Sequence, residues 1–261
     1  MRPRKEKEEV DPPFPGYIRE IRLKRTGIPG FENYPYSLPV VRTLGTLRLH
    51  PKVTFFVGEN GSGKSTLLEA VANAVGMNAE GGGKNFFFAT RRSDSDLGEH
   101  LIVVRGAERE KDCFFLRAES FYNVATEIEK LNLYLGDYGD RSLHEQSHGE
   151  SFLALFTHRF FGRGFYVLDE PEAALSPQRQ MAFLAALHAH VTDRKSQFVI
   201  ATHSPIILAY PHATIYEFSS EGIRETKYED TEQYRTTRSF LEDRDRFLRH
   251  LLAPLKDDPP Q

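Results

Sequence analysis

The stretch GENGSGKS, residues 58–65, decides the fold of this 261-residue chain, because it joins a predicted strand to a predicted helix. It fits the pattern G-x-x-x-x-G-K-[ST], in which glycines let backbone amides turn inward around phosphate oxygens. The apolar run Val53–Val57 before it predicts a buried strand, and STLLEAVANAVG after it has helical spacing and ends on Gly76. The helix would add the positive end of its dipole. Together these features predict a nucleoside-triphosphate site.

Each part of the loop has an expected role at the triphosphate. Lys64 would reach the β- and γ-phosphates, the Ser65 hydroxyl would hold Mg²⁺, and Thr66 would contact the inner phosphates together with neighbouring amides. The alternative is a glycine-rich turn that matches the pattern by chance, and the strand–loop–helix context argues against it. The predicted binding residues of the loop are Asn60, Gly61, Ser62, Gly63, Lys64, Ser65 and Thr66.

Two further predicted strands end in residues suited to the same phosphates. The apolar run FYVLD, residues 165–169, is followed by Glu170, and QFVIAT, residues 197–202, is followed by His203. Asp169 would sit beside Mg²⁺, directly or through a water, and Glu170 would activate the attacking water as a base. His203 would donate to the γ-phosphate or position that water. Taken alone, Asp169 and Glu170 are equally typical of a helix N-cap, and a single histidine is more often structural.

The loop QSHGES, residues 146–151, precedes another strongly helical stretch. Ser147 and the Gly149 amide at a helix N-terminus predict a second anion site. One phosphate tail hardly needs two such sites far apart in the sequence, so we expect this one to serve a nucleotide held by another subunit. The alternative is an ordinary N-cap at Ser147, with Glu150 in the acidic first turn.

Composition limits the classes of protein that remain. With 34 Lys and Arg against 37 Asp and Glu, the net charge is −3, so any nucleic-acid contact would depend on a local basic patch. The single Cys113 cannot form an internal disulfide, and no apolar run approaches the about 20 residues of a membrane span. The charged N-terminus also lacks the apolar stretch of a signal peptide. We therefore expect a soluble, cytoplasmic protein without membrane insertion.

The order of predicted elements indicates an α/β fold with a predominantly parallel central sheet. Residues 1–16 are expected to form a flexible tail, and 17–261 a single domain with C-terminal helices at about 230–252. The basic cluster RLKR, residues 22–25, is interpreted as a solvated strand edge, with contact to DNA phosphates as the alternative.

The ordered motifs resemble those of the ATP-binding-cassette (ABC) ATPases across most of residues 17–215. GENGSGKST corresponds to the Walker A loop, SHGES to the signature, YVLDEPEAALS to Walker B with the D-loop, and ATHSP to the switch histidine. Within the family, the chain is similar to stand-alone ATPase heads of the recombination-repair and chromosome-maintenance type. It also resembles short bacterial predicted ATPases of the AAA family, including the stretch FFLRAESFYNVAT.

The resemblance implies a P-loop NTPase fold with an antiparallel β lobe and a helical signature subdomain, here at about 118–162. It implies an ATPase that forms a head-to-tail dimer around ATP and Mg²⁺, drives or gates a protein partner, and acts in DNA repair or anti-phage defence. A nucleic-acid partner is left open. Each ATP would lie between two sets of residues, Lys64, Ser65, Asp169, Glu170 and His203 of one subunit and Ser147, Gly149 and Glu150 of the other.

The sequence departs from the family pattern in three places. His148 stands where the signature usually has its first glycine, and Ser176 where the D-loop usually has aspartate. No glutamine occurs between Lys64 and Gln146, so the Q-loop glutamine is missing; Glu119 is a candidate substitute or a surface acid. The missing glutamine and the atypical signature count against one alternative, a transporter ATPase subunit. Ser176 and the missing glutamine keep another alternative open, a nucleotide-gated sensor with little turnover. For stacking on adenine the candidates are Phe31, Tyr34 and Tyr36, whose alternative role is loop packing.

Overall fold

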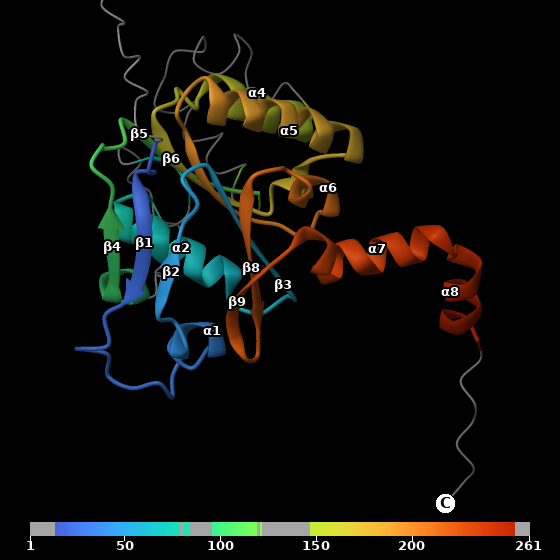
Figure 1. Cartoon of the computed structure of the whole chain (residues 1–261), viewed down its shortest axis with the longest axis horizontal. Coiled ribbons are helices and arrows are strands. Elements are labelled where there is room, and N and C mark those ends of the chain that lie inside the picture. Colours follow the sequence, from blue (N-terminus) through green and yellow to red (C-terminus); the bar gives the residue numbers. More distant parts are fainter. Residues whose placement is uncertain (1–13, 79–80, 84–95, 119–120, 122–146, 254–261) are drawn as a thin grey trace, which may run out of the picture.

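A six-stranded sheet forms the centre of the computed structural model, which describes residues 14–78, 81–83, 96–118, 121 and 147–253 (Figure 1). Its strand order is β5-β6-β7-β3-β8-β9, with the first five strands parallel and β9 antiparallel. The predicted α/β fold with a mainly parallel sheet is thereby confirmed. The strands are β3 (Val53–Gly58), β5 (Asp112–Arg117), β6 (Gly164–Asp169), β7 (Gln197–Ala201), β8 (Ala213–Ser219) and β9 (Gly222–Thr226).

A second, antiparallel sheet has the strand order β2-β1-β4, formed by Thr46–Arg48, Ile18–Leu23 and Leu101–Arg105. This sheet is the predicted antiparallel lobe. The basic cluster at 22–25 begins within β1, which is the middle strand, so the expected strand edge is wrong. Its cations are nevertheless exposed, because Arg22 and Lys24 point away from the core while Leu23 faces it.

Helices cover both faces of the central sheet. The helix α2 (Lys64–Val75) packs between the two sheets, whereas α4 (His148–His158), α5 (Pro177–Thr192) and α6 (Pro205–Leu208) contribute to the opposite core. Neighbouring residues of β3 divide between the cores, since Phe55 faces α4 and α5 and Phe56 faces α2. Both faces of the strand are therefore dry, which explains its continuous apolar run.

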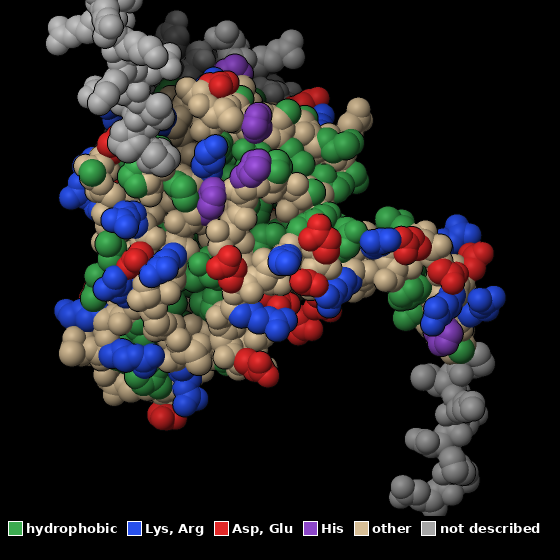
Figure 2. Space-filling view, viewed as in Figure 1, with side chains coloured by type: hydrophobic (Ala, Val, Ile, Leu, Met, Phe, Trp, Pro, Cys, Tyr) green, Lys and Arg blue, Asp and Glu red, His purple; other side chains and the backbone are tan. Residues whose placement is uncertain are grey.

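The remaining helices lie at the margins of the sheets. The short α1 (Pro39–Arg42) precedes β2, while α7 (Glu232–Glu242) and α8 (Arg244–Leu251) extend away from the body (Figure 1). Acidic and basic side chains are interspersed along these last two helices (Figure 2). Within the described part of the chain, short 3₁₀ helices span Asp96–His100, Pro171–Ala174 and Tyr228–Asp230. Among the described helices we find none with the length and apolar character needed to cross a membrane.

Two predicted segments fall largely outside the described residues. Residues 1–13 of the expected tail are not among them, and neither is most of the expected helical lobe at 118–162, including Glu119.

The side chain of Gln197 joins the two sheets. Its Oε1 accepts hydrogen bonds from the amides of Tyr17 (2.8 Å) and Ile18 (3.0 Å), and its Nε2 donates to the carbonyls of Ile18 (2.8 Å) and His50 (3.0 Å). Gln197 is fully buried, so water cannot replace these bonds. One amide thereby fixes the start of β1 and the turn before β3 against the start of β7.

Replacing Gln197 with leucine keeps the volume and removes all four hydrogen bonds. We expect Gln197→Leu to lower the free energy of unfolding by about 3 kcal/mol or more, because each buried, unpaired backbone group costs roughly 1–3 kcal/mol. Urea denaturation followed by circular dichroism measures the loss. The control is Gln178→Leu at an exposed position of α5, expected to change stability by less than about 0.5 kcal/mol. Equal effects of the two variants would contradict the role given to Gln197.

Candidate nucleotide site

The loop between β3 and α2 owes its shape to glycines. Gly58, Gly61 and Gly63 have φ angles of 142°, 79° and 96°, in the region that side chains disfavour. Space is also lacking, because a Cβ on Gly58 would lie 2.3 Å from the Phe218 carbonyl oxygen and one on Gly63 2.7 Å from Val40. The loop therefore requires the glycines that the sequence pattern singled out.

One hydroxyl of this loop lacks a partner. Ser62 Oγ is buried and has no hydrogen-bond partner among the described residues. Buried polar atoms are rarely left unpaired in folded proteins. A phosphate oxygen at the loop would supply the missing partner, so the loop fits the anion that its sequence predicts.

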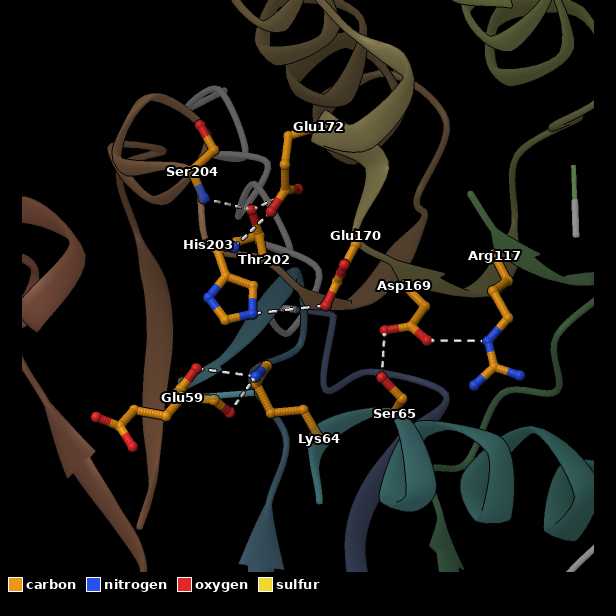
Figure 3. Close-up of polar contacts among 11 residues, drawn as sticks. Glu59, Lys64, Ser65, Arg117, Asp169, Glu170, Glu172, Thr202, His203 and Ser204 are labelled. Atoms are coloured by element: carbon orange, nitrogen blue, oxygen red, sulfur yellow. Dashed lines mark hydrogen bonds and ion pairs between the residues drawn. The ribbon is translucent and has the colours of Figure 1, made fainter. Parts of the chain in front are cut away.

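The ammonium of Lys64 lies inside the loop. Its Nζ donates to the carbonyl oxygens of Gly58 (2.8 Å) and Glu59 (2.9 Å), and the residue is only 4% exposed (Figure 3). Burial lowers the pKa of Lys64, while the nearby carboxylates of Glu170 and Asp169 act in the opposite direction. Since an ammonium has three donors, one N–H remains for a phosphate oxygen.

Asp169 at the end of β6 is held from two sides. Ser65 Oγ donates to its Oδ1 at 3.1 Å, and Arg117 Nε donates to its Oδ2 at 3.1 Å (Figure 3). Burial raises the pKa of Asp169, and the Arg117 guanidinium opposes that rise. Arg117 also lies 3.5 Å from Glu69 on α2, so it links three elements of the site. Sequence reasoning missed Arg117; only its register opposite Asp169 in the β5–β6 pair reveals it.

Ser65 and Asp169 form an oxygen-rich pair that suits Mg²⁺. This ion prefers a few protein oxygens together with water and phosphate oxygens. The hydroxyl and the carboxylate lie 3.1 Å apart beside the loop, and Asp169 is 4% exposed. The two residues thus fit the ion predicted for them.

Glu170 and His203 lie close to each other and near Lys64. Glu170 has a left-handed backbone, with φ 52°, and its amide donates to the Ala201 carbonyl at 3.0 Å. This turn places its Oε1 3.5 Å from His203 Nε2 (Figure 3). Burial lowers the pKa of His203, and the Lys64 cation lowers it further. The side chains of Glu170 and His203 are 39% and 32% exposed, but the Nε2 atom of His203 is buried and has no hydrogen-bond partner among the described residues.

Glu172 fixes the segment that carries His203. Its carboxylate accepts hydrogen bonds from Thr202 Oγ1 at 2.7 Å and from the amide of His203 (Figure 3). Burial raises the pKa of Glu172, and these hydrogen bonds oppose the rise. Sequence reasoning did not single out Glu172, although it lies two residues after the predicted base.

The other predicted residues, Ser147, Gly149 and Glu150, lie at the start of α4 in a separate group. The amide and hydroxyl of Ser147 donate to Glu150 Oε2 at 3.0 and 2.7 Å, which forms a capping box. Arg179 of α5 donates to both side chains. Ser147 is therefore an N-cap, as the alternative interpretation expected, and its side-chain partners come from α4 and α5.

Two aromatic candidates for adenine differ in accessibility. Tyr34 is 66% exposed, and its hydroxyl lies 3.1 Å from Thr66 Oγ1 in the first turn of α2. Tyr36 is buried, donates to Asp96 and packs edge-on against His100. Tyr34 is thus exposed beside the loop, while Tyr36 serves loop packing.

Two protein-family models match parts of the chain. One, described as an AAA domain, covers residues 38–131 and includes the glycine loop. The other, described as an AAA domain, putative AbiEii toxin, Type IV TA system, covers residues 117–209 and includes Asp169, Glu170 and His203. The resemblance to an ATPase head is thereby confirmed. Comparison with curated proteins finds no match.

Several solved structures are similar in overall arrangement. The SMC head domain from Thermotoga maritima matches with a TM-score of 0.47 and 15% identity, over 81% of this chain and 99% of its own. cbiO1 from Clostridium perfringens, part of the ABC transporter complex cbiONQ, matches with a TM-score of 0.48 and 18% identity, over 91% of this chain and 99% of its own. The SmcHead bound to the C-winged helix domain of ScpA matches with a TM-score of 0.41 and 14% identity, over 80% of this chain and 97% of its own.

Proposed function

We propose that this chain is an ABC-type ATPase that hydrolyses ATP to ADP and phosphate in sites shared by two copies. The convergence of Lys64, Asp169, Glu170 and His203 around one glycine loop supports this most strongly. Lys64 begins the helix after β3, and the other three lie at or just after the carboxyl ends of β6 and β7. The three strands are adjacent and parallel, and α/β proteins commonly bind ligands at this edge of the sheet. The AAA-domain matches support the same class of reaction.

The chain's own residues divide the chemistry between them. Lys64 would bind the β- and γ-phosphates and offset negative charge that grows in the transition state. Glu170 would accept a proton from the attacking water, and His203 would hold that water or donate to the γ-phosphate. Ser65 and Asp169 would hold Mg²⁺, which neutralises phosphate charge when bound. Glu172 and Arg117 act indirectly, since they position His203 and Asp169.

The second half of the proposed site comes from another copy. Ser147 and Gly149 lie at the N-terminus of α4, which favours an anion, and their own nucleotide loop belongs to a different part of the fold. A head-to-tail pair would bring this helix end to the γ-phosphate held by the partner, as the resemblance to ABC ATPases implies. ATP binding would close the pair and hydrolysis would open it.

This cycle of closing and opening would drive or gate a protein partner in the cytoplasm. DNA repair and anti-phage defence are the proposed settings; the first rests on the resemblance to chromosome-maintenance ATPases. The second fits the name of the matching family, which mentions a toxin–antitoxin system.

Substitution of Ser147 by arginine tests the shared site. We expect Ser147→Arg to leave ATP binding to the monomer unchanged and to abolish ATP-dependent dimerisation, because a large side chain would fill the helix end that meets the partner's phosphate. Equilibrium binding of a fluorescent ATP analogue and analytical ultracentrifugation measure the two properties.

The matched control for this substitution is Thr192→Arg, another exposed position, at the C-terminal end of α5. It should dimerise with ATP as the natural protein does. Dimers that persist with Ser147→Arg would refute the shared site, and a natural protein that neither dimerises nor hydrolyses ATP would refute the proposed function.

A further inference from the structure

Arg179 of α5 contacts the predicted signature at the start of α4. Its Nη1 donates to Ser147 Oγ at 3.0 Å, and its Nη2 donates to Glu150 Oε1 at 2.9 Å. The helices α4 and α5 lie side by side (Figure 1). The guanidinium therefore occupies the place where the resemblance puts the partner's γ-phosphate.

The packing around Gly149 shows how closely Arg179 approaches this helix end. A Cβ on Gly149 would lie 2.5 Å from Nη1 of Arg179 and 2.8 Å from the Ala174 carbonyl oxygen. Glycine at this position lets the guanidinium lie directly against the backbone of α4. The backbone of Arg179 is fixed in the first turn of α5, because the Ser176 side chain caps that helix by accepting a hydrogen bond from the Arg179 amide.

The present partner of Arg179 is one that a phosphate can replace. The Arg179 and Glu150 side chains are 33% and 56% exposed, and ion pairs at such exposure contribute little stability. A γ-phosphate carries more charge than a carboxylate and presents several oxygens to the planar donor fork of arginine. Exchange of Glu150 for a phosphate would therefore be favourable.

The cation of Arg179 lies at the point where the signature departs from the family pattern. The chain has His148 where the signature usually has its first glycine, so the motif departs from the family pattern beside the place where a phosphate would approach. An arginine from α5 supplies donors and a permanent positive charge at the same place.

We propose that Arg179 is a nucleotide-binding residue that acts on the ATP held by the other copy. In the ATP-bound pair it leaves Glu150 and binds the partner's γ-phosphate together with Ser147 and Gly149. The proposal rests on the shared site described under Proposed function, and it adds a residue that the motifs do not contain.

Sedimentation of variants in a Glu170→Gln background tests this role. With saturating ATP and Mg²⁺, Arg179→Ala should weaken dimerisation at least about tenfold, the loss expected for a charge-assisted hydrogen bond. The dimer affinity of Arg179→Lys should lie between that of the parent and that of Arg179→Ala, because lysine keeps the positive charge but lacks the planar donor fork of arginine. At protein concentrations where the chain is monomeric, the ATP affinity of both Arg179 variants should stay within about twofold of the parent's, because Arg179 would contact only the ATP held by the other copy.

The matched control is Arg244→Ala on α8, which also removes an exposed arginine with an acidic partner at 2.9 Å. It should dimerise as the parent does. Dimerisation that is unchanged or strengthened by Arg179→Ala would overturn the proposal, and so would an equal loss of ATP binding by the monomer. If the Glu170→Gln parent itself fails to dimerise with ATP, the shared site fails and this inference fails with it.

Discussion

Glu170→Gln is expected to reduce ATP hydrolysis by at least about 100-fold, the usual contribution of a positioned base. The amide has the size of the carboxylate and can still contact His203, which lies 3.5 Å from the present carboxylate, but it cannot accept a proton from water. ATP binding should persist because Lys64 and the loop are unchanged. The variant should therefore accumulate as an ATP-bound dimer, detected by phosphate release and analytical ultracentrifugation.

The control for this variant is Glu229→Gln, which makes the same chemical change at an exposed position before α7. It should hydrolyse ATP at the rate of the natural protein. Equal phosphate release by Glu170→Gln and the natural protein would remove Glu170 from the mechanism. A natural protein that binds ATP and dimerises without measurable turnover would instead be the nucleotide-gated sensor.

Lys64→Ala is expected to weaken ATP binding on the order of 100-fold and to stop hydrolysis. Removing one partner of a buried, hydrogen-bonded charge pair commonly costs 2–5 kcal/mol, and about 1.4 kcal/mol corresponds to a tenfold change in affinity. The ammonium is 4% exposed and held at the loop by two carbonyls, so no solvent-exposed cation can take its place easily. Isothermal titration with ATP and Mg²⁺ measures the loss.

The matched control is Lys52→Ala, because Lys52 precedes β3 while Lys64 follows the loop at its other end. Lys52 is exposed, and its removal should leave ATP affinity unchanged within about twofold. Circular dichroism should show that both variants keep the fold. ATP binding by Lys64→Ala with the natural affinity would contradict the phosphate-binding role of the loop.

Much of the central sheet could be predicted from the sequence because its signals are local. Val53–Val57 is apolar at every position, as expected when both faces are covered, and the glycine loop directly follows it. Parallel strands then bring their carboxyl ends to one edge, so Asp169 and His203 meet the loop although far from it in sequence. The order of the strands along the chain and their parallel arrangement were therefore enough to predict that Asp169 and His203 lie near the loop.

The contacts of Arg117, Glu172 and Arg179 could not be predicted in this way. Arg117 reaches Asp169 only because β5 and β6 pair in one particular register. Arg179 reaches Ser147 only because α5 packs beside α4, which depends on side-chain packing between the helices. Such partners depend on tertiary geometry, and no spacing along the chain encodes it. The strand-edge interpretation of residues 22–25 failed for the same reason, since pairing on both sides of β1 is nonlocal.

The Gln197 side chain has a consequence for how the protein moves. It fastens the antiparallel sheet to the start of β7 by four hydrogen bonds in a dry environment, and such a network opens only when the packing around it opens. We therefore expect the two sheets to move together as one unit. Under the proposed function, we expect the nucleotide-linked changes at contacts outside this unit, such as the exposed ion pair between Glu150 and Arg179, which separates at little cost.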